Sequence, residues 1–210
     1  MEGDYFYCQI SRIRPNRYQP RKNFNEEELA ALSASIKEQG IIQPLLIRKL
    51  EDGYELVAGE RRLRAAKLAG YRDVPCVIKA LTEKQLLEMS LVENIQRENL
   101  NPMEEAHAYH RLITEFELTQ EETAIQVGKS RSAVANFLRL RQLPEAIQES
   151  IVDGILGMGH ARALLGISNK TQQSAVWRTV ISKGLSVRET EALVNRIKKK
   201  TGNVRKPKEG

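Results

Sequence analysis

Three arginines cluster directly after a short apolar run, in residues 59–64 (GERRLR). The run 54–58 predicts a strand, and the residues after Gly59 predict a helix. At such a turn the first backbone N–H groups of the helix have no partner within it, and they form the positive end of the helix dipole. The pattern therefore predicts an anion-binding site, with phosphate as the natural ligand.

A solvated helix face is the alternative for this cluster, because charged helices are common. Arginines in a first turn oppose the helix dipole, however, and lower stability unless an anion compensates for them. The chain has neither the G-x-x-x-x-G-K-[ST] pattern of a P-loop nor a G-x-G-x-x-G dinucleotide turn.

A second polar cluster, residues 93–97 (ENIQR), follows about one helix and one strand later. Carboxylate and amide oxygens are the ligands that Mg²⁺ prefers, and Glu93 and Asn94 supply both. Glu93, Asn94 and Arg97 lie at positions i, i+1 and i+4, so they can converge on one site. Together the two clusters suggest a nucleoside triphosphate held with magnesium.

The composition indicates a two-domain, cytoplasmic protein without a membrane segment. The 210 residues exceed one typical domain, 41% of them are hydrophobic, and no apolar run is long enough to cross a bilayer or serve as a signal peptide. The two cysteines, Cys8 and Cys76, lack metal-ligand spacing, which favours free thiols in a reducing compartment.

The positive charge lies mainly at the end of the chain. Residues 160–210 hold twelve lysines or arginines and three acidic residues, whereas the whole chain has a net charge of +6. A basic C-terminal half beside a phosphate-binding N-terminal half indicates a second, polyanionic partner, and DNA or RNA is the natural candidate.

The hydrophobic pattern predicts an α+β fold, a small α/β domain followed by an all-α domain. The second half begins at Thr82, which forms a capping box with Gln85, and every later segment has helical periodicity. In the first half, strands are expected at 10–13, 45–50, 54–58 and 74–79, and helices at 26–39, capped by Asn25, and 61–69.

A helix-turn-helix is predicted at residues 119–141. Thr119 caps one short helix, Gly128 ends it, and Ser130 caps the next. On a helical wheel, Ala133, Val134, Phe137, Leu138 and Leu140 fall on one side of the second helix. The opposite side carries Ser132, Ala135, Asn136 and Arg139, with Arg131 flanking. A small, polar and cationic face suits a helix that reads the major groove, although a plain surface helix is also polar outside.

Ordered motifs over most of the chain resemble the ParB family of chromosome and plasmid partition proteins, whose nucleotide domain is related in fold to sulfiredoxin. These motifs are residues 19–22 (QPRK), 43–45 (QPL), 59–66 (GERRLRAA), 93–97 (ENIQR), 101–106 (NPMEEA), 128–132 (GKSRS) and 158–160 (MGH).

The resemblance implies more than the residues show. ParB proteins bind a palindromic centromere site, parS, through the helix-turn-helix, and they bind CTP with Mg²⁺ in the N-terminal domain. Two protomers then close into a clamp that slides on DNA, and slow hydrolysis of CTP to CDP reopens it. Family members also engage a ParA-type ATPase through an N-terminal segment and dimerise through a C-terminal domain. We recognise neither the ParA-binding segment nor the dimerisation domain in this sequence, and we therefore expect it to be part of a longer protein.

The resemblance also implies a role for individual residues. Glu60 and Gln19 would support hydrolysis, and Glu93 and Asn94 would hold the metal. The loop around residues 43–47 is the candidate base pocket, although a buried strand explains its apolar side chains equally well. The implied nucleotide-binding residues are Gly59, Arg61, Arg62, Arg64, Arg21, Asn94 and Arg97, and the implied DNA-binding residues are Lys129, Ser130, Arg131, Ser132, Asn136 and Arg139.

The implied domains are a CTP-binding domain (1–81), connecting helices that complete the nucleotide site (82–118), a parS-binding helix-turn-helix domain (119–200) and a linker tail (201–210). Three alternatives remain open. The chain could be a passive DNA-binding protein without a nucleotide switch. It could be an enzyme like sulfiredoxin, which needs a reactive cysteine, although Cys76 lies in an apolar run. It could belong to the nucleoid-occlusion branch of the family, which tends to carry glutamine where this chain has Arg131.

Overall fold

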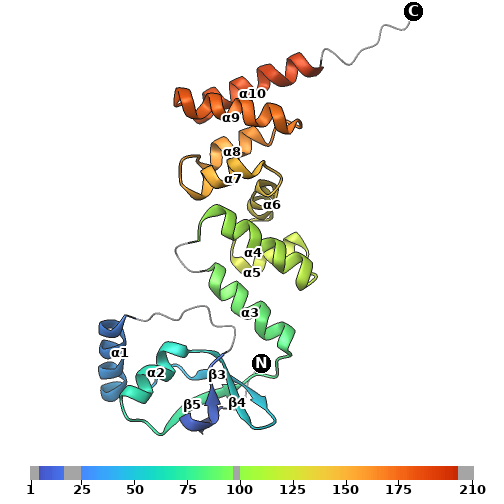
Figure 1. The fold of residues 1–210 in the computed structure, drawn as a ribbon. Helices are drawn as coiled ribbons and strands as arrows, with labels where there is room; N and C mark the ends of the chain where they lie inside the picture. The colour runs from blue at the N-terminus through green and yellow to red at the C-terminus, as the bar shows by residue number, and fades with distance from the viewer. Residues whose placement is uncertain (1–4, 17–24, 97–99, 203–210) are drawn as a thin grey trace, which may run out of the picture. The chain divides into compact units, whose positions relative to one another are not determined.

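A computed structural model describes residues 5–16, 25–96 and 100–202 of the chain. The chain divides into two compact units, Met1–Asn94 and Ile95–Gly210. The division falls inside the expected connecting region 82–118, and each unit is described by itself below (Figure 1).

The first unit is built on a mixed five-stranded sheet. Its strands run in the order β1-β5-β3-β4-β2, with β3–β4 and β1–β5 antiparallel and β3–β5 and β2–β4 parallel. The central strands contribute Leu45, Ile47 and Leu56, all fully buried. The strands are β1 (Tyr5–Gln9), β2 (Ile13–Arg14), β3 (Leu45–Leu50), β4 (Gly53–Ala58) and β5 (Asp73–Ile78).

Two helices pack in this unit, α1 (Glu26–Gln39) and α2 (Glu60–Leu68), and they lie side by side (Figure 1). Asn25 caps α1 as predicted, because its side chain accepts a hydrogen bond from the Glu27 backbone N–H. Helix α2 buries Leu63 against the sheet core.

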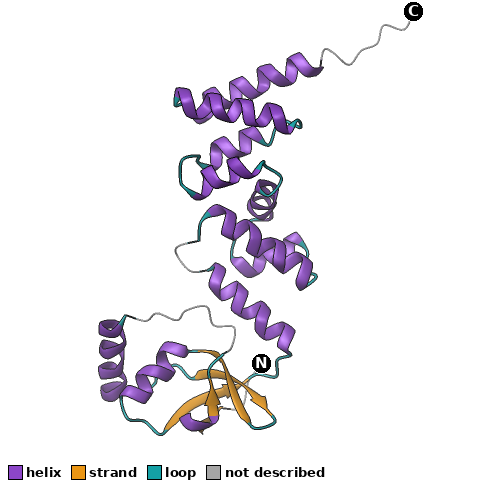
Figure 2. Ribbon diagram, in the orientation of Figure 1, coloured by secondary structure: helices purple, strands orange, loops and turns teal. Residues whose placement is uncertain are grey.

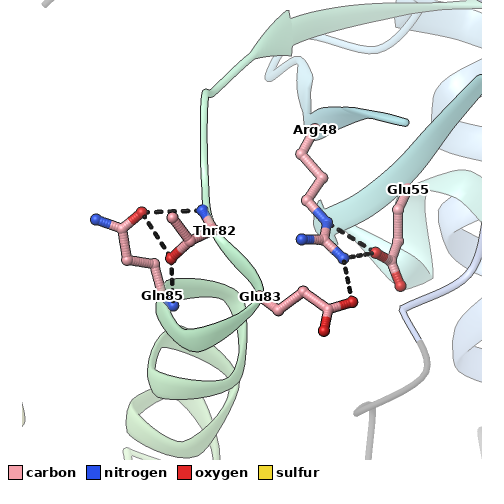
Figure 3. Close-up of polar contacts among 5 residues, drawn as sticks. All are labelled: Arg48, Glu55, Thr82, Glu83 and Gln85. Carbon is pink, nitrogen blue, oxygen red and sulfur yellow. Dashed lines mark hydrogen bonds and ion pairs between the residues drawn. The ribbon is translucent and has the colours of Figure 1, made fainter. Parts of the chain in front are cut away.

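A third helix, α3 (Glu83–Ile95), begins at the predicted capping box (Figure 3). The Thr82 backbone N–H donates to Oε1 of Gln85 at 3.0 Å, and the Gln85 N–H donates to Oγ1 of Thr82 at 3.2 Å. The reciprocal bonds satisfy two backbone donors that a bare helix start would leave unpaired, so the helix start is fixed by its own sequence.

The second unit is helical throughout the part that the structure describes, which confirms the α+β class (Figure 2). None of the described helices is long and apolar enough to cross a membrane. Its main core includes Leu140, Ile147 and Leu164. The helices are α4 (Pro102–Glu115), α5 (Gln120–Val127), α6 (Arg131–Leu140), α7 (Glu145–Val152), α8 (Met158–Leu164), α9 (Lys170–Lys183) and α10 (Val187–Gly202).

The predicted strand at residues 10–13 is wrong. Residues Ile10–Arg12 form one turn of 3₁₀-helix, and only Ile13 continues into β2. Ile10 and Ile13 are both buried, and a spacing of three residues brings them to the same side of such a turn. Strand β1 was not predicted, although residues 5–8 (YFYC) are aromatic or apolar and favour a strand.

Both thiols are predicted to be unreactive in the folded protein. Cys8 and Cys76 are free and buried, and burial raises the pKa of both, that of Cys76 to about 12. The raised pKa values disfavour the thiolate form of both residues, which is the nucleophile, and burial also restricts access of the reagent. Labelling with iodoacetamide at pH 8 should modify neither cysteine in the native state and both in urea. Rapid native labelling of Cys76 would instead support the sulfiredoxin-like alternative.

Candidate functional site

The turn between β4 and α2 has the backbone geometry that the sequence predicted. Gly59 has φ 111°, in the left-handed region that favours glycine. A Cβ at this position would also lie 3.3 Å from Cγ of Leu45, tighter than most contacts. Gly59 is the N-cap of α2 and has no side chain to cap it, so within the described residues the N-cap leaves the first N–H groups of the helix available to a ligand. The turn is therefore a suitable cradle for an anion.

Two of the three arginines pair with carboxylates of the same unit. Nη2 of Arg61 lies 2.7 Å from Oε2 of Glu28 on α1, and Nε of Arg64 lies 2.7 Å from Oε1 of Glu60. Protein acids thus supply part of the negative charge that the helix start was expected to require. The Arg61–Glu28 pair is about half exposed on both sides, so a ligand with more charge can displace it at small cost.

The third arginine, Arg62, reaches the loop before β3. Its Nη1 donates to the carbonyl oxygens of Gln43 and Pro44 at 2.7 and 2.8 Å. Burial lowers the pKa of Arg62 from its usual value, although an arginine stays charged at neutral pH. Two bonds use only part of the five N–H groups of a guanidinium. Arg62 therefore joins the helix start to the loop that was proposed as the base pocket.

Glu60 carries the clearest sign of a ligand site. Its side chain is only 7% exposed, and Oε2 is buried without a hydrogen-bond partner among the described residues. A buried carboxylate oxygen without a donor is costly, and such atoms usually mark a bound water, ion or ligand. A metal-bound water or a phosphate-associated water next to Gly59 would supply a donor, so the residues present fit a hydrated nucleotide with its metal.

The other proposed nucleotide-binding residues lie on another helix or outside the residues that the structure describes. Glu93 and Asn94 occupy the last turns of α3. Gln19, Arg21 and Arg97 lie outside the described residues. The structure thus brings Gly59, Glu60, Arg61, Arg62 and Arg64 together at one helix start, and the assignment of the others stays a prediction.

The helix-turn-helix has the predicted caps. Thr119 and Glu122 form a reciprocal capping box at α5, and Gly128 ends this helix with φ 68°. The Ser130 hydroxyl accepts from the Ala133 N–H at 3.2 Å and starts α6. Within α6, Val134 and Leu140 are fully buried. The helix is therefore fixed on one side, as a recognition helix must be.

The exposed side of α6 carries most of the proposed DNA-binding side chains. Arg131, Ser132 and Arg139 are exposed, and Asn136 is half-buried. Arg131 lies 4.0 Å from Glu121, and Nη2 of Arg139 lies 3.5 Å from the carbonyl oxygen of Leu165. Both distances are at the outer limit of such contacts, so these arginines can turn toward phosphate or base edges at little cost.

Lys129 has a contact within the protein that the sequence did not indicate. Its Nζ lies 2.9 Å from Oε2 of Glu105 on α4 and 5.2 Å from the ring centre of Phe137. The same carboxylate oxygen accepts a short hydrogen bond from the hydroxyl of Tyr109, whose ring packs edge-on against Phe137. Burial, and secondarily the bond to Glu105, raises the pKa of Tyr109, which keeps it a donor. Lys129 thus ties the turn of the helix-turn-helix to α4, and its contact with DNA stays a prediction.

Sequence reasoning missed two partners of the site. Glu28 lies in the first turn of α1, and nothing in its spacing links it to Arg61. Glu105 lies inside the motif 101–106, so the motif marks the residue but not its partner. Pairings between elements distant in sequence follow from the fold and have no local periodic pattern.

A helix-turn-helix domain joined to a small mixed-sheet domain with an uncapped, arginine-rich helix start defines the class of protein. The chain matches the family model of the ParB N-terminal domain over residues 4–95 and that of the ParB helix-turn-helix domain over residues 98–199. These matches cover nearly the whole chain. The chain belongs to the ParB family.

Curated relatives and a solved structure agree with this membership. Stage 0 sporulation protein J of Bacillus subtilis (strain 168) is 48% identical over 95% of this chain, and the chromosome-partitioning protein ParB of Myxococcus xanthus (strain DK1622) is 51% identical over 88%. The chain spans 71% and 62% of the length of these two proteins. A C-terminally truncated ParB from Caulobacter crescentus, solved on the centromeric parS site, is 43% identical, with a TM-score of 0.75 over 91% of this chain and 99% of that one.

Replacing Lys129 by methionine should destabilise the second unit. The change keeps an apolar stem over Phe137 but leaves Glu105, whose side chain is 16% exposed, without its cation. We expect a loss of about 1 kcal/mol in the free energy of unfolding. Urea unfolding followed by the fluorescence of Trp177, the one tryptophan of the chain, measures it in this unit. Arg131→Met is the control, because its ion pair is long and exposed, and equal shifts for both variants would contradict the structural role of Lys129.

Proposed function

We propose that this chain is the nucleotide- and DNA-binding part of a chromosome-partitioning protein, which binds parS through α5 and α6 and CTP with Mg²⁺ at the start of α2. The observation that carries the nucleotide half is the start of α2, where the N-cap is a glycine and Arg61 and Arg62 follow Glu60, whose buried Oε2 has no hydrogen-bond partner among the described residues. The partner DNA is taken from the Caulobacter relative in complex with parS.

At the phosphate site, each residue has a distinct task. The backbone N–H groups after Gly59 and the guanidinium of Arg61 would bind phosphate oxygens, since charge-assisted bonds to oxyanions are the strong ones. Arg62 would contact phosphate while holding the carbonyls of Gln43 and Pro44. Glu93 and Asn94 would hold Mg²⁺, which neutralises phosphate charge when bound.

Hydrolysis would depend on Glu60. Its Oε2 lies buried next to the anion cradle and accepts no bond from the described residues, so it is suited to orient an attacking water. Oε1 is held by Arg64, which fixes the carboxylate. Gln19 would assist, by the resemblance alone. The reaction would be slow hydrolysis of CTP to CDP and phosphate, acting as a switch that reopens a clamp of two protomers.

The alternative without a nucleotide switch rests on one observation. Arg61 and Arg64 have carboxylate partners within the unit, so the cluster does not require a ligand for charge balance. In that case the protein is a passive parS binder, and its affinity for DNA is indifferent to nucleotide. The nucleotide binding of arginine variants separates the two.

Alanine at Arg61 or at Arg62 should abolish or strongly weaken CTP binding, by about tenfold or more, because each removes charge-assisted bonds to phosphate. Binding of parS and the fold should survive. Isothermal titration calorimetry with CTP and Mg²⁺ measures the effect. Lys67→Ala is the control, an exposed cation of the same helix. Wild-type CTP affinity in both arginine variants would show that the phosphate site is misplaced.

Alanine at Asn136 or at Arg139 should weaken specific binding of parS by about 1–3 kcal/mol for each lost base contact. The salt-sensitive binding of a random duplex should change little, because it depends on other cations. Fluorescence anisotropy with both duplexes tests this, and Lys170→Ala, an exposed cation on α9, is the control. An equal loss on both duplexes would reduce these residues to backbone contacts.

Clamp closure should need both ligands. A single cysteine introduced on the surface of the first unit should crosslink between protomers with CTP and parS together, and little without them, since Cys8 and Cys76 are buried. Glu60→Ala and Gln19→Ala should bind CTP but hydrolyse it slowly, and so accumulate the crosslinked form. Crosslinking that ignores nucleotide and DNA would exclude the clamp mechanism and favour the passive binder.

A further inference from the structure

The face of the sheet opposite α2 carries a buried pair of opposite charges. Arg48 on β3 and Glu55 on β4 lie directly opposite each other in the strand register, and they are 5% and 4% exposed. Nε and Nη2 of Arg48 donate to Oε2 of Glu55 at 2.8 and 2.5 Å. Because Ile47 and Leu56, the next residues along the strands, belong to the core with α2, alternation places the pair on the other face.

A second carboxylate approaches the same arginine from helix α3 (Figure 3). Oε1 of Glu83, in the first turn of α3, lies 3.8 Å from Nη2 of Arg48, and its side chain is 64% exposed. Arg48 therefore has a buried partner on the neighbouring strand and an exposed partner on the helix that follows the sheet. The buried partner holds the guanidinium in place, and the exposed one links α3 to it.

Stability alone does not explain a charged pair at this place. Taking both charges out of water is costly, and apolar residues of similar size are often as stable or more stable. An apolar pair at positions 48 and 55 would pack, but it could not bind Glu83. The charge on Arg48 therefore serves to bind Glu83 at the start of α3.

A second polar contact holds helix α3, two turns after Glu83. Nδ2 of Asn16 donates to Oγ of Ser90 at 2.9 Å, and both residues are buried. Between the two polar contacts lies Leu86, which is fully buried. Residues 83, 86 and 90 lie at i, i+3 and i+7, so one stripe of α3 carries all three contacts.

We infer that Arg48 and Ser90 are positioning residues, which fix α3 on the sheet and thereby place Glu93 and Asn94 for the nucleotide and its metal. Glu93 and Asn94 follow Ser90 by three and four residues, one helical turn further along, so their placement follows from that of the stripe. The part of the inference that concerns ligand binding rests on the proposed function, whereas the fastening of α3 does not.

The test uses a cycle of variants in the whole chain. Glu83→Gln removes the exposed partner, and the double replacement Arg48→Met with Glu55→Met removes the buried pair together, so that no charge is left buried alone. The matched control is Glu51→Gln, which removes one negative charge from the exposed turn between β3 and β4. Hydrogen exchange of the α3 amides is measured without nucleotide, and CTP affinity with Mg²⁺ is measured by calorimetry.

Glu83→Gln should speed exchange in α3 by about twofold, because the pair is 3.8 Å long and exposed on the side of Glu83, and it should weaken CTP binding. In the background of the double replacement the same change should have a clearly smaller effect, since the contact with Arg48 is gone and only the other interactions of Glu83, such as that with the helix start, remain. Glu51→Gln should change neither reading. The inference fails if Glu83→Gln acts equally in both backgrounds, or if α3 loosens while CTP affinity stays the same. If the wild-type chain binds no CTP, the proposed function fails, and the exchange data still decide whether Arg48 fastens α3.

Discussion

The sharp turn at Gly59 is the constraint on which the first unit depends. A strand ends and a helix begins at this one residue, where φ is 111° and a Cβ would lie 3.3 Å from Cγ of Leu45, so a side chain here would be both strained and crowded. Glycine at the N-cap gives the helix no side-chain cap among the described residues, so its first N–H groups are available to an anion. Three arginines and the buried carboxylate of Glu60 follow this turn, so one backbone conformation accounts for the part of the candidate phosphate site that lies at the start of α2.

Charged side chains inside each unit position the elements that carry the surface sites. In the first unit, Arg48 is held by Glu55 and contacts the start of α3. In the second, Lys129 contacts Glu105 across the turn of the helix-turn-helix. Arg48 lies outside the proposed ligand-binding residues, whereas Lys129 is itself a proposed DNA-binding residue whose cation contacts Glu105. Each of the two contacts fixes an element that carries proposed ligand-binding residues. A charged pair in such a place can define the geometry of the element even when it adds little net stability.

The sequence predicted those features that depend on a few neighbouring residues, such as helix caps. The caps at Asn25, Thr82, Thr119 and Ser130 appear as expected, because one side chain and the next few N–H groups determine a helix start. The edge strand β1 was missed although residues 5–8 (YFYC) favour a strand, because so short a run shows no clear period and its pairing with β5 is a long-range contact. The partners of Arg61, Arg48 and Lys129 could not be predicted either, because each pair joins residues that only the fold brings together.

In the proposed function, one chain couples a phosphate site to a DNA-binding domain. Linkage is reciprocal: if nucleotide changes the affinity of the protein for DNA, then DNA changes its affinity for nucleotide by the same factor. The most direct measurement is a titration of radiolabelled CTP, ATP, GTP and UTP with Mg²⁺, with and without a parS duplex and with a scrambled duplex as control. The account predicts binding of CTP alone among the four and a change in its affinity with parS only. Binding of none, or CTP binding that is the same with every duplex, would contradict it.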